Sequence, residues 1–395
     1  MTELFSIARL PRIEFGAGSV KKLPAILARY GKRVLLVSGG HSFLGSPHWE
    51  WLSAALQEQG FSWETFKVTG EPSPQLVDEA VAALRGGQFD VVLGIGGGSV
   101  LDAAKAIAGL LKPGNSVLDH LEGVGPELPY RGPATPFVAV PTTAGTGSEA
   151  TKNAVLSVHG GEGFKKSFRD EQLVPEYAVV DPDLLASCPS HLIAANGMDA
   201  FTQLLESYVS SKANPFTDAL AWSGMEAVRD GLPAWYENGP DAPAGREKMA
   251  YAALLSGITL AQVGLGSVHG LAAPLGAFFP MPHGVACGTL LAAATRVNIA
   301  VMAAREPANP ALAKYARVGR LLHGMKHMDD IAARGALLQS LEAWTEGMHL
   351  PRLGEFGVGE ADLPRIIANC RGSSMKTNPV LLSDAEVGEV LRARL

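Results

Sequence analysis

The chain has few cysteines, and they do not form a motif. Only three occur among 395 residues, at Cys188, Cys287 and Cys370, and no two of them form a CxxC pair. This number and spacing argue against a disulfide framework and against a zinc site built on paired cysteines. We therefore expect a protein of a reducing compartment, the cytoplasm.

Other signals of particular partners are missing as well. The sequence has no basic run with interleaved aromatic residues, and its net charge of −6 and pI near 6.0 give no reason to expect nucleic acid or an anionic membrane as a partner. We find no uninterrupted apolar stretch of about 18–20 residues, so no membrane span is expected. The opening segment MTELFSIARLPRIEFG also lacks the basic and apolar regions of a signal peptide.

The length and the apolar pattern predict two domains. A chain of 395 residues exceeds the roughly 250–300 residues at which a single core usually splits. In the first half, short β-branched runs alternate with amphipathic stretches of helical period, which is typical of a parallel sheet covered on both faces. Strands are predicted at 33–38, 62–68, 90–95 and 137–140, and helices at 49–60, at 75–85 and from the glycines after 95 to 110.

Helical patterns dominate from residue 183 onward. Long helices are predicted at 191–211, 215–231, 245–263 and 284–304, with several more toward the C-terminus. The domain boundary is therefore placed near residue 182, with an α/β domain at 1–182 and a helical domain at 183–395. The segment 113–136 is rich in proline and glycine and is predicted to be a surface loop.

Two segments rich in glycine and hydroxyl groups follow predicted strands. GIGGGSVLD (94–102) allows a diphosphate to approach the backbone closely and offers it the free N–H groups of a helix start. PTTAGTGSE (141–149) adds four hydroxyls and two glycines. A tight turn or a capped helix start explains either segment alone. Both together, at the carboxyl ends of neighbouring strands, favour a bound dinucleotide.

Two histidines stand in the apolar segment GLGSVHGLAAPLGAFFPMPHGV (264–285). His269 and His283 need partners there, because an unpaired buried polar group costs roughly 1–3 kcal/mol. A shared divalent metal would satisfy both imidazoles, and so would ordinary hydrogen bonds. The two histidines alone leave both explanations open.

Four motifs together resemble the iron-containing, or group III, alcohol dehydrogenase family. They are GGGSVLDAAKAIA (96–108), PTTAGTGSEAT (141–151), GMDAFTQLLESYVS (197–210) and VHGLAAPLG with PHGV (268–285), and the resemblance covers essentially the whole chain. It implies a Rossmann-like N-terminal domain and a helical metal-binding domain, in the two-domain architecture also known from dehydroquinate synthase. It further implies NAD(P), a divalent metal such as Fe²⁺ or Zn²⁺, and a small alcohol, aldehyde or ketone as substrate.

The resemblance also implies the residues that contact the cofactor. Glycines and hydroxyl groups would hold the nucleotide, Asp102 would lie near the nicotinamide, and one of two lysines in the following strand region would also touch the cofactor. The full predicted set is Gly39, Gly40, Gly97, Gly98, Ser99, Asp102, Thr142, Thr143, Thr146, Ser148, Lys165 and Lys166.

The metal ligands of the family match this chain at three positions of four. The family uses an aspartate, a histidine one helical turn later and two further histidines. Asp199, His269 and His283 correspond to three of these, whereas the fourth position is Gln203. Asp199 and Gln203 are spaced i and i+4 on one predicted helix, so both can face the same ion. We expect a weaker but functional site in which Gln203 is either an oxygen ligand or a group beside the ligands.

Two further departures from the family pattern concern the cofactor end of the site. Ala273 stands where many relatives carry a histidine that relays a proton, so the proton must leave through water, a ribose hydroxyl or another residue. Gly39 stands where relatives that prefer NAD often carry an aspartate. Its absence removes repulsion of a 2′-phosphate, and NADPH is expected to be accepted or preferred.

The predicted reaction is direct hydride transfer between C4 of the nicotinamide and the carbinol carbon, assisted by the metal as a Lewis acid. A metal-independent reductase similar to maleylacetate reductases, a lyase of the dehydroquinate-synthase type and a non-catalytic nucleotide-binding protein stay open as alternatives. The intact PTTAGTGSE segment argues against the first two. A homodimer or higher homo-oligomer is expected.

Two more predictions concern a C-terminal segment and the remaining histidines. The segment 371–379 is rich in hydrogen-bond donors, and a solvated loop is favoured over a role at the substrate entrance. The histidines outside the apolar segment are assigned no role, for example His41, His323 and His349.

Overall fold

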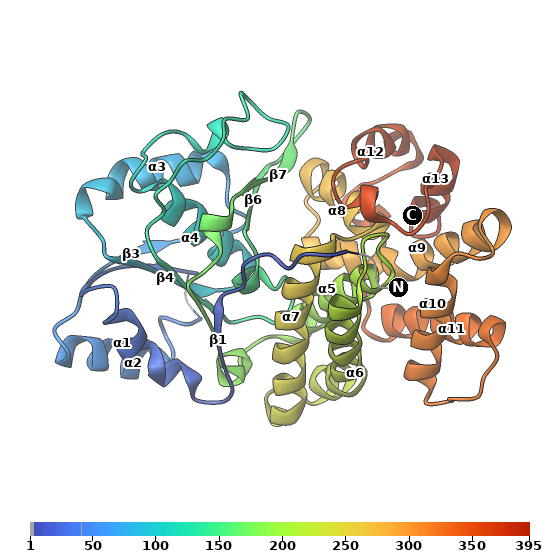
Figure 1. Ribbon diagram of the computed structural model, residues 1–395, viewed down its shortest axis with the longest axis horizontal. Helices are drawn as coiled ribbons and strands as arrows, with labels where there is room; N and C mark the ends of the chain where they lie inside the picture. Colours follow the sequence, from blue (N-terminus) through green and yellow to red (C-terminus); the bar gives the residue numbers. More distant parts are fainter. Residues whose placement is uncertain (1–3, 41) are drawn as a thin grey trace.

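The computed structural model describes residues 4–40 and 42–395 and shows two halves side by side (Figure 1). The N-terminal half contains a parallel sheet with helices, and the C-terminal half is helical. Residues 1–3 and His41 lie outside the described residues. The predicted fold class is thus confirmed. The boundary near 182 stays a prediction and falls between the last strand of the sheet and the long helix that begins at Ser190.

Six parallel strands form the sheet, in the order β1-β8-β5-β4-β2-β3. Their bounds are β1 Arg12–Phe15, β2 Arg33–Ser38, β3 Ser62–Lys67, β4 Val91–Gly96, β5 Phe137–Pro141 and β8 Tyr177–Val180. The register pairs Ser38 with Ile95 and Gly96 with Pro141. The carboxyl ends of β2, β4 and β5 therefore lie together at one edge of the sheet, where the two glycine-rich segments were predicted to meet.

Side chains of the central strands alternate between two buried faces. Val34 and Leu36 belong to a core that continues into the helical half, whereas Leu35 and Val37 pack with α3 and α4. The helices of this half are α1 Leu23–Leu27, α2 Pro47–Glu58, α3 Pro74–Leu84 and α4 Gly98–Leu110. Burial on both faces explains why the strands are nearly continuous apolar runs.

The sequence pattern did not predict β1 or the antiparallel hairpin of β6 (Asn153–Val158) and β7 (Phe164–Arg169). These strands are short and partly exposed, and β7 carries charged side chains at three of its six positions, Lys165, Lys166 and Arg169. Without an apolar alternation the strand period is hidden.

The segment 113–136 is irregular apart from one short 3-10 turn, η3 at Val117–Asp119.

The helical half is built around long buried helices. Their bounds are α5 Ser190–Val209, α6 Pro215–Asn238, α7 Pro243–Val263, α8 Ser267–Phe278, α9 His283–Arg305, α10 Pro310–His323, α11 Asp330–Gly347, α12 Leu363–Asn369 and α13 Asp384–Arg392. Helix α9 is long and apolar enough to cross a membrane by length and composition, but 78% of its most apolar window is buried in the protein. Such burial is typical of a helix in the core of a folded domain.

The two halves meet through a close backbone contact. Gly147 has φ of 61°, and a Cβ at Gly257 of α7 would lie 2.1 Å from the Gly147 carbonyl oxygen. Only glycines fit at this crossing, because a side chain on either residue would push the two backbones apart. The second glycine-rich segment is thereby fixed directly against the helical half.

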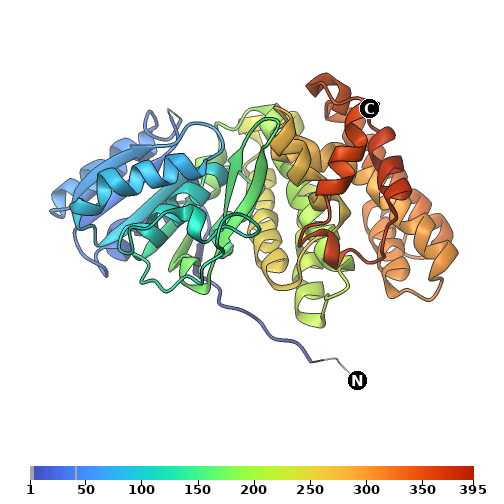
Figure 2. The same ribbon diagram turned by 90° about the horizontal axis from the view of Figure 1, so that it is seen from above.

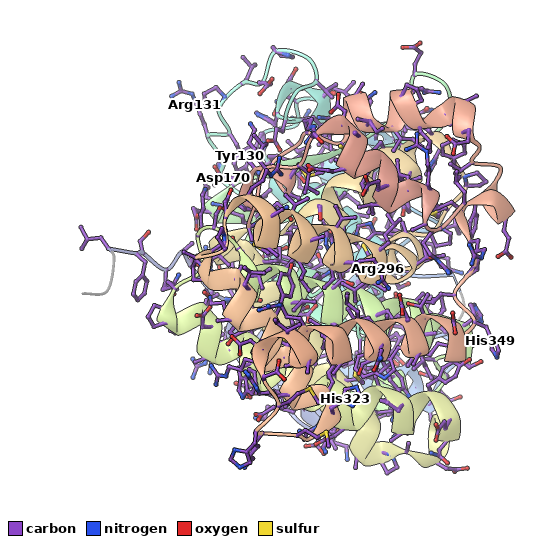
Figure 3. All side chains as sticks on the ribbon, turned by 90° about the vertical axis from the view of Figure 1, so that its right-hand side faces the viewer. Tyr130, Arg131, Asp170, Arg296, His323 and His349 are labelled. Atoms are coloured by element: carbon purple, nitrogen blue, oxygen red, sulfur yellow. The ribbon has the colours of Figure 1, made fainter. Side chains whose placement is uncertain are left out.

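The N-terminal segment leaves the α/β half as an extended chain (Figure 2). It runs along the helical half, where the Ala8 N–H donates to Gln262 of α7 over 2.7 Å. His323 and His349, which were assigned no role, lie on the outer part of the helical half (Figure 3). His323 ends α10 and contacts the Ala336 carbonyl, as expected of a structural histidine.

Candidate active site

The first glycine-rich segment forms a tight turn from β4 into α4. β4 ends at Gly96, α4 begins at Gly98, and the Thr142 N–H donates to the Gly96 carbonyl oxygen over 3.0 Å. A Cβ at Gly98 would lie 2.6 Å from Oγ1 of Thr146. The turn thus leaves backbone N–H groups at the start of α4 uncovered, which suits an anionic diphosphate.

A buried lysine ties the two segments together. Lys105 of α4 is 0% exposed, and its Nζ donates to the Ser148 carbonyl and hydroxyl, to Oγ1 of Thr151 and to the Asn153 carbonyl. Burial lowers the pKa of Lys105 to about 8. The Ser148 hydroxyl in turn donates to Asp102 over 2.5 Å. Lys105 therefore holds Ser148 in place directly, and Asp102 through the Ser148 hydroxyl. Lys105 was not singled out from the sequence.

The other predicted cofactor residues lie around the same edge. Gly39 and Gly40 follow β2, and an added Cβ meets only Val100 at 3.7 Å in the first case and nothing within 4 Å in the second. Lys165 of β7 forms an ion pair of 2.7 Å with Glu71. Lys166 also faces the cavity described next.

A cavity of about 330 Å³ lies between the two halves. Residues of the two glycine-rich segments and of the β6–β7 hairpin line one side, and residues of the helical half line the other. From the predicted set it is lined by Gly98, Ser99, Asp102, Thr146, Ser148, Lys165, Lys166, Gln203, His269 and His283. The structure thus brings the candidate cofactor and metal residues to one space. Thr142 and Thr143 directly follow β5 and are not among the residues that line the cavity.

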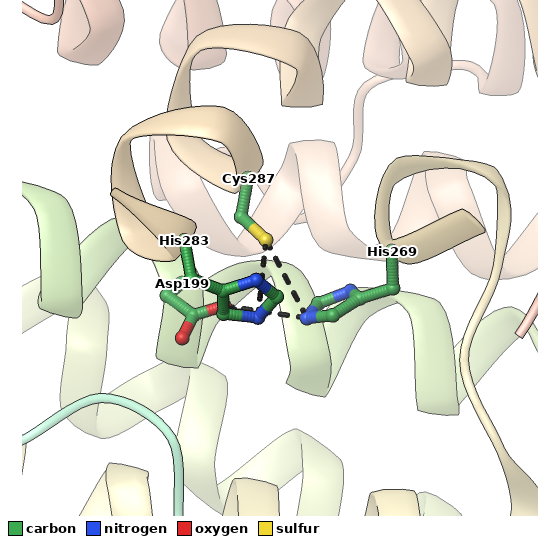
Figure 4. Close-up of side chains that lie close together, drawn as sticks. All are labelled: Asp199, His269, His283 and Cys287. Carbon is green, nitrogen blue, oxygen red and sulfur yellow. Dashed lines mark hydrogen bonds and ion pairs between the residues drawn. The ribbon is translucent and has the colours of Figure 1, made fainter. Parts of the chain in front are cut away.

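Four metal-binding side chains converge at the helical wall of this cavity (Figure 4). Asp199 comes from α5, His269 from α8, and His283 and Cys287 from the first turns of α9. One ligand atom from each lies within 4.8 Å of every other. Nε2 of His269 is 3.3 Å from Oδ1 of Asp199, and Nε2 of His283 is 3.9 Å from the same oxygen.

The Asp199 carboxylate is the unusual member of this cluster. It is 1% exposed, and among the described residues neither of its oxygens has a hydrogen-bond donor with acceptable geometry. An unpaired buried carboxylate is costly, so such a group calls for a cation. Burial alone would raise the pKa of Asp199, but His283 and His269 lower it below its usual value. The carboxylate is thus ionised and available to a metal.

Glu206 orients one of the two imidazoles. Its carboxylate accepts from Nδ1 of His269 over 2.6 Å and from the Val268 N–H over 2.7 Å. If Nδ1 carries the proton, Nε2 turns its lone pair toward Asp199, as in a carboxylate–histidine–metal arrangement. Burial lowers the pKa of His269, but Cys287, Asp199 and Glu206 raise it well above its usual value. The carboxylates of Asp199 and Glu206 face the two ring nitrogens of His269, and both favour the positively charged form of the ring.

On the largely buried helix α5, Asp199, Gln203 and Glu206 are spaced i, i+4 and i+7. This polar stripe was visible in the sequence, and Glu206 could have been found from it.

The imidazole of His283 differs from that of His269. Burial lowers the pKa of His283 to about 4 and keeps its ring neutral, as a metal ligand must be.

Replacing Glu206 with glutamine should weaken metal binding by about 10–100-fold, the usual effect of changing a partner of a ligating histidine. The amide keeps the hydrogen bond to His269 but removes the charge that favours it. Titration of metal-free protein with Zn²⁺ would measure the change. Glu226→Gln, on the exposed part of α6, is the matched control. Unchanged affinity in Glu206→Gln would contradict the orienting role.

Gln203 lies beside the cluster and is 2% exposed. Its Oε1 accepts from the Ser256 hydroxyl over 2.6 Å. The amide oxygen is therefore already engaged, which fits the second of the two roles considered for it, a group beside the ligands. Ala273 lines the cavity and offers no proton acceptor.

The segment 371–379 is more ordered than a solvated loop. Gly372, Ser373 and Ser374 line the cavity, whereas Thr377 and Asn378 are buried and bonded to the segment before α8. The preference for a solvated loop was therefore wrong. Hydrogen bonds to the backbone of 265–267 hold the segment at the cavity.

Models of known protein families match both halves of the chain. The model described as "Iron-containing alcohol dehydrogenase" matches residues 11–182, and "Fe-containing alcohol dehydrogenase family, C-terminal" matches residues 193–395. The chain belongs to the iron-containing alcohol dehydrogenase family. It is an oxidoreductase that acts on CH–OH groups, and its family uses NAD(H) and a divalent metal.

Individual relatives of this iron-containing alcohol dehydrogenase are similar over nearly their whole length. The chain is 33% identical to 1-propanol dehydrogenase PduQ of Salmonella typhimurium strain LT2, over 97% of this chain and 98% of the relative. It is 30% identical to an NAD-dependent methanol dehydrogenase of Bacillus methanolicus, over 98% of each. A crystal structure of 1,3-propanediol oxidoreductase superposes with a TM-score of 0.88 at 29% identity, covering 100% of both chains.

Proposed function

We propose that this alcohol dehydrogenase depends on a divalent metal and transfers a hydride between the nicotinamide C4 and the carbinol carbon of a small alcohol. Asp199, His269 and His283 would hold the ion. The observation that carries the proposal is the buried Asp199 carboxylate, which has no hydrogen-bond donor among the described residues and faces two imidazole nitrogens. Relatives named for 1-propanol and methanol support a small alcohol as substrate.

The chain's own residues would bind the cofactor, orient the metal ligands and exclude water from the site. The start of α4 and the Thr146 and Ser148 side chains would hold the cofactor. Lys105 fixes the second glycine-rich segment through its hydrogen bonds to Ser148. Glu206 keeps Nε2 of His269 directed at the site. A bound metal would supply Lewis-acid polarisation of the substrate oxygen, and the nicotinamide would give or accept the hydride. Because Ala273 carries no proton acceptor, the alcohol proton leaves through water or a ribose hydroxyl.

The proposal includes the use of NADP(H) as well as NAD(H). Gly39 follows β2 at the edge where the cofactor would lie, and it has no carboxylate to repel a 2′-phosphate. We also propose that the enzyme works in the cytoplasm as a homodimer or higher homo-oligomer.

Replacing Gly39 with aspartate should shift the preference toward NADH. The new carboxylate would repel a 2′-phosphate at close range, so the ratio of kcat/KM for NADPH to that for NADH should fall by about 10–100-fold, equal to roughly 1.4–2.8 kcal/mol. Steady-state kinetics with both cofactors measure this ratio. Gly161→Asp in the β6–β7 turn, where an added Cβ meets nothing within 4 Å, is the control. Wild-type activity with NADH and none with NADPH would refute the cofactor proposal.

A substrate screen tests the proposed function. Small alcohols, aldehydes and ketones are offered with NAD(H) or NADP(H), with and without added Fe²⁺ or Zn²⁺, while nicotinamide absorbance is followed. We expect net cofactor turnover that needs the metal. Turnover unaffected by chelation would favour a metal-independent reductase, and reaction without net turnover would favour a lyase.

A further inference from the structure

Cys287 lies at the candidate metal site but has no part in the proposed function. It follows His283 by one helical turn on α9 and is 0% exposed. Its Sγ is 3.6 Å from Nε2 of His269 and 3.8 Å from Nε2 of His283. The family pattern implied by the sequence uses no cysteine, so this thiol is an additional donor at the point where three ligands meet.

The distances around Nε2 of His269 match those of a tetrahedral site, whereas Nε2 of His283, 3.9 Å from Oδ1 of Asp199, has to move closer. With zinc bonds of about 2.3 Å to sulfur and about 2.0–2.1 Å to nitrogen or oxygen, tetrahedral angles place sulfur about 3.6 Å from nitrogen and nitrogen about 3.3 Å from oxygen. The sulfur lies 3.6 and 3.8 Å from the two ring nitrogens, and Nε2 of His269 lies 3.3 Å from Oδ1 of Asp199. One ion could therefore bind Cys287 and His269 together with Asp199 after small adjustments.

Two other side chains support the same conclusion. Asp199 is 1% exposed and, among the described residues, has no hydrogen-bond donor, so this carboxylate calls for a cation independently of the cysteine. Gln203, at the position of the missing family histidine, directs its oxygen to Ser256 instead. The set of donors at the site is then one carboxylate, two imidazoles and one thiol.

We propose that Cys287 is the fourth protein ligand of the metal and takes the part of the histidine that Gln203 replaces. On binding, an S–metal bond replaces the S–H bond, and the proton goes to solvent. A thiolate and a carboxylate together balance the charge of a divalent ion, and sulfur favours Zn²⁺ over Fe²⁺. This inference rests on the proposed function, because it assumes that a metal binds here.

The position of Cys287 keeps the site open to substrate. His269, His283 and Gln203 line the cavity between the halves, whereas Cys287 and Asp199 do not. The thiol would bind the ion from the buried side. The cavity side stays available for a substrate oxygen, and zinc accepts a fifth ligand during reaction.

Cobalt spectroscopy and X-ray absorption test the proposal without relying on activity. The full-length protein is freed of metal, then loaded with Co²⁺ or Zn²⁺. Wild-type protein should show a thiolate-to-cobalt charge-transfer band, and its zinc spectrum should contain a sulfur shell at about 2.3 Å. Cys287→Ser should lose both signals and bind Co²⁺ on the order of 100-fold more weakly. Cys188→Ser, a cysteine outside the cluster, should keep both signals.

A double variant separates loss of a ligand from loss of folding. Gln203→His with Cys287→Ser should regain tight Co²⁺ binding with nitrogen and oxygen ligands only. Wild-type protein that binds cobalt without a sulfur signal would overturn the cysteine proposal and leave the proposed function intact. Wild-type protein that binds no divalent metal at all would overturn both.

Discussion

Asp199→Asn should abolish metal binding and lower kcat by about 10³-fold or more, since Lewis-acid stabilisation is worth several kcal/mol and 1.36 kcal/mol is tenfold in rate. The amide is nearly the same size but is a much weaker ligand than the ionised carboxylate. It removes the only acidic side chain of the four that converge on this point.

Thermal unfolding distinguishes this effect from damage to the fold. A metal that binds only the folded state stabilises it by about 2.7 kcal/mol at 100 times its Kd, so added Zn²⁺ should raise the Tm of wild-type protein. The same addition should leave the Tm of Asp199→Asn unchanged. Asp241→Asn, an exposed aspartate next to α7, should behave like wild type. A metal-induced rise in Tm and near-normal kcat in Asp199→Asn would exclude this carboxylate as a ligand.

Gly98→Val should reduce cofactor affinity by about 100-fold, or roughly 2.7 kcal/mol. The new Cβ would lie 2.6 Å from Oγ1 of Thr146, so the two glycine-rich segments must separate. The branched side chain would also cover the N–H groups at the start of α4, which are expected to bind the diphosphate. Nicotinamide fluorescence titrations measure the loss.

Zinc titration of the same variant checks that the helical half is intact, because Gly98 lies in the other half of the protein. The control is Gly335→Val in α11, at an exposed position where an added Cβ meets nothing within 4 Å. It should bind cofactor as wild type does. Normal cofactor affinity in Gly98→Val would show that the diphosphate does not bind at this turn.

The parallel sheet could be predicted because its strands are buried on both faces. β2 and β4 are apolar runs with glycine close behind them, and the sequence placed both within one or two residues. The β6–β7 hairpin could not be predicted in the same way. The side chains of β7 are mostly polar or charged and only partly buried, so they show no apolar alternation. Its position over the cavity is set by tertiary contacts such as the ion pair of Lys165 with Glu71.

Motifs and spacing marked most of the candidate residues that the structure brings together, whereas residues that only folding places there were not singled out. The structure brings Asp199, His269 and His283 together from three helices, as the resemblance implied. Cys287 was dismissed because cysteine-based zinc sites were sought as cysteine pairs, although its i, i+4 spacing from His283 was visible. Lys105 gave no signal, because its four acceptors come from a segment more than 40 residues away.

If the proposed function is right, hydride transfer requires a divalent metal at this site. The most direct measurement is alcohol-dependent NAD(P)⁺ reduction by protein freed of metal with a chelator and then titrated with Zn²⁺ or Fe²⁺. We expect no activity without metal and full activity at about one ion per chain, as a single cluster requires. Full activity in protein shown by elemental analysis to contain no divalent metal would contradict it.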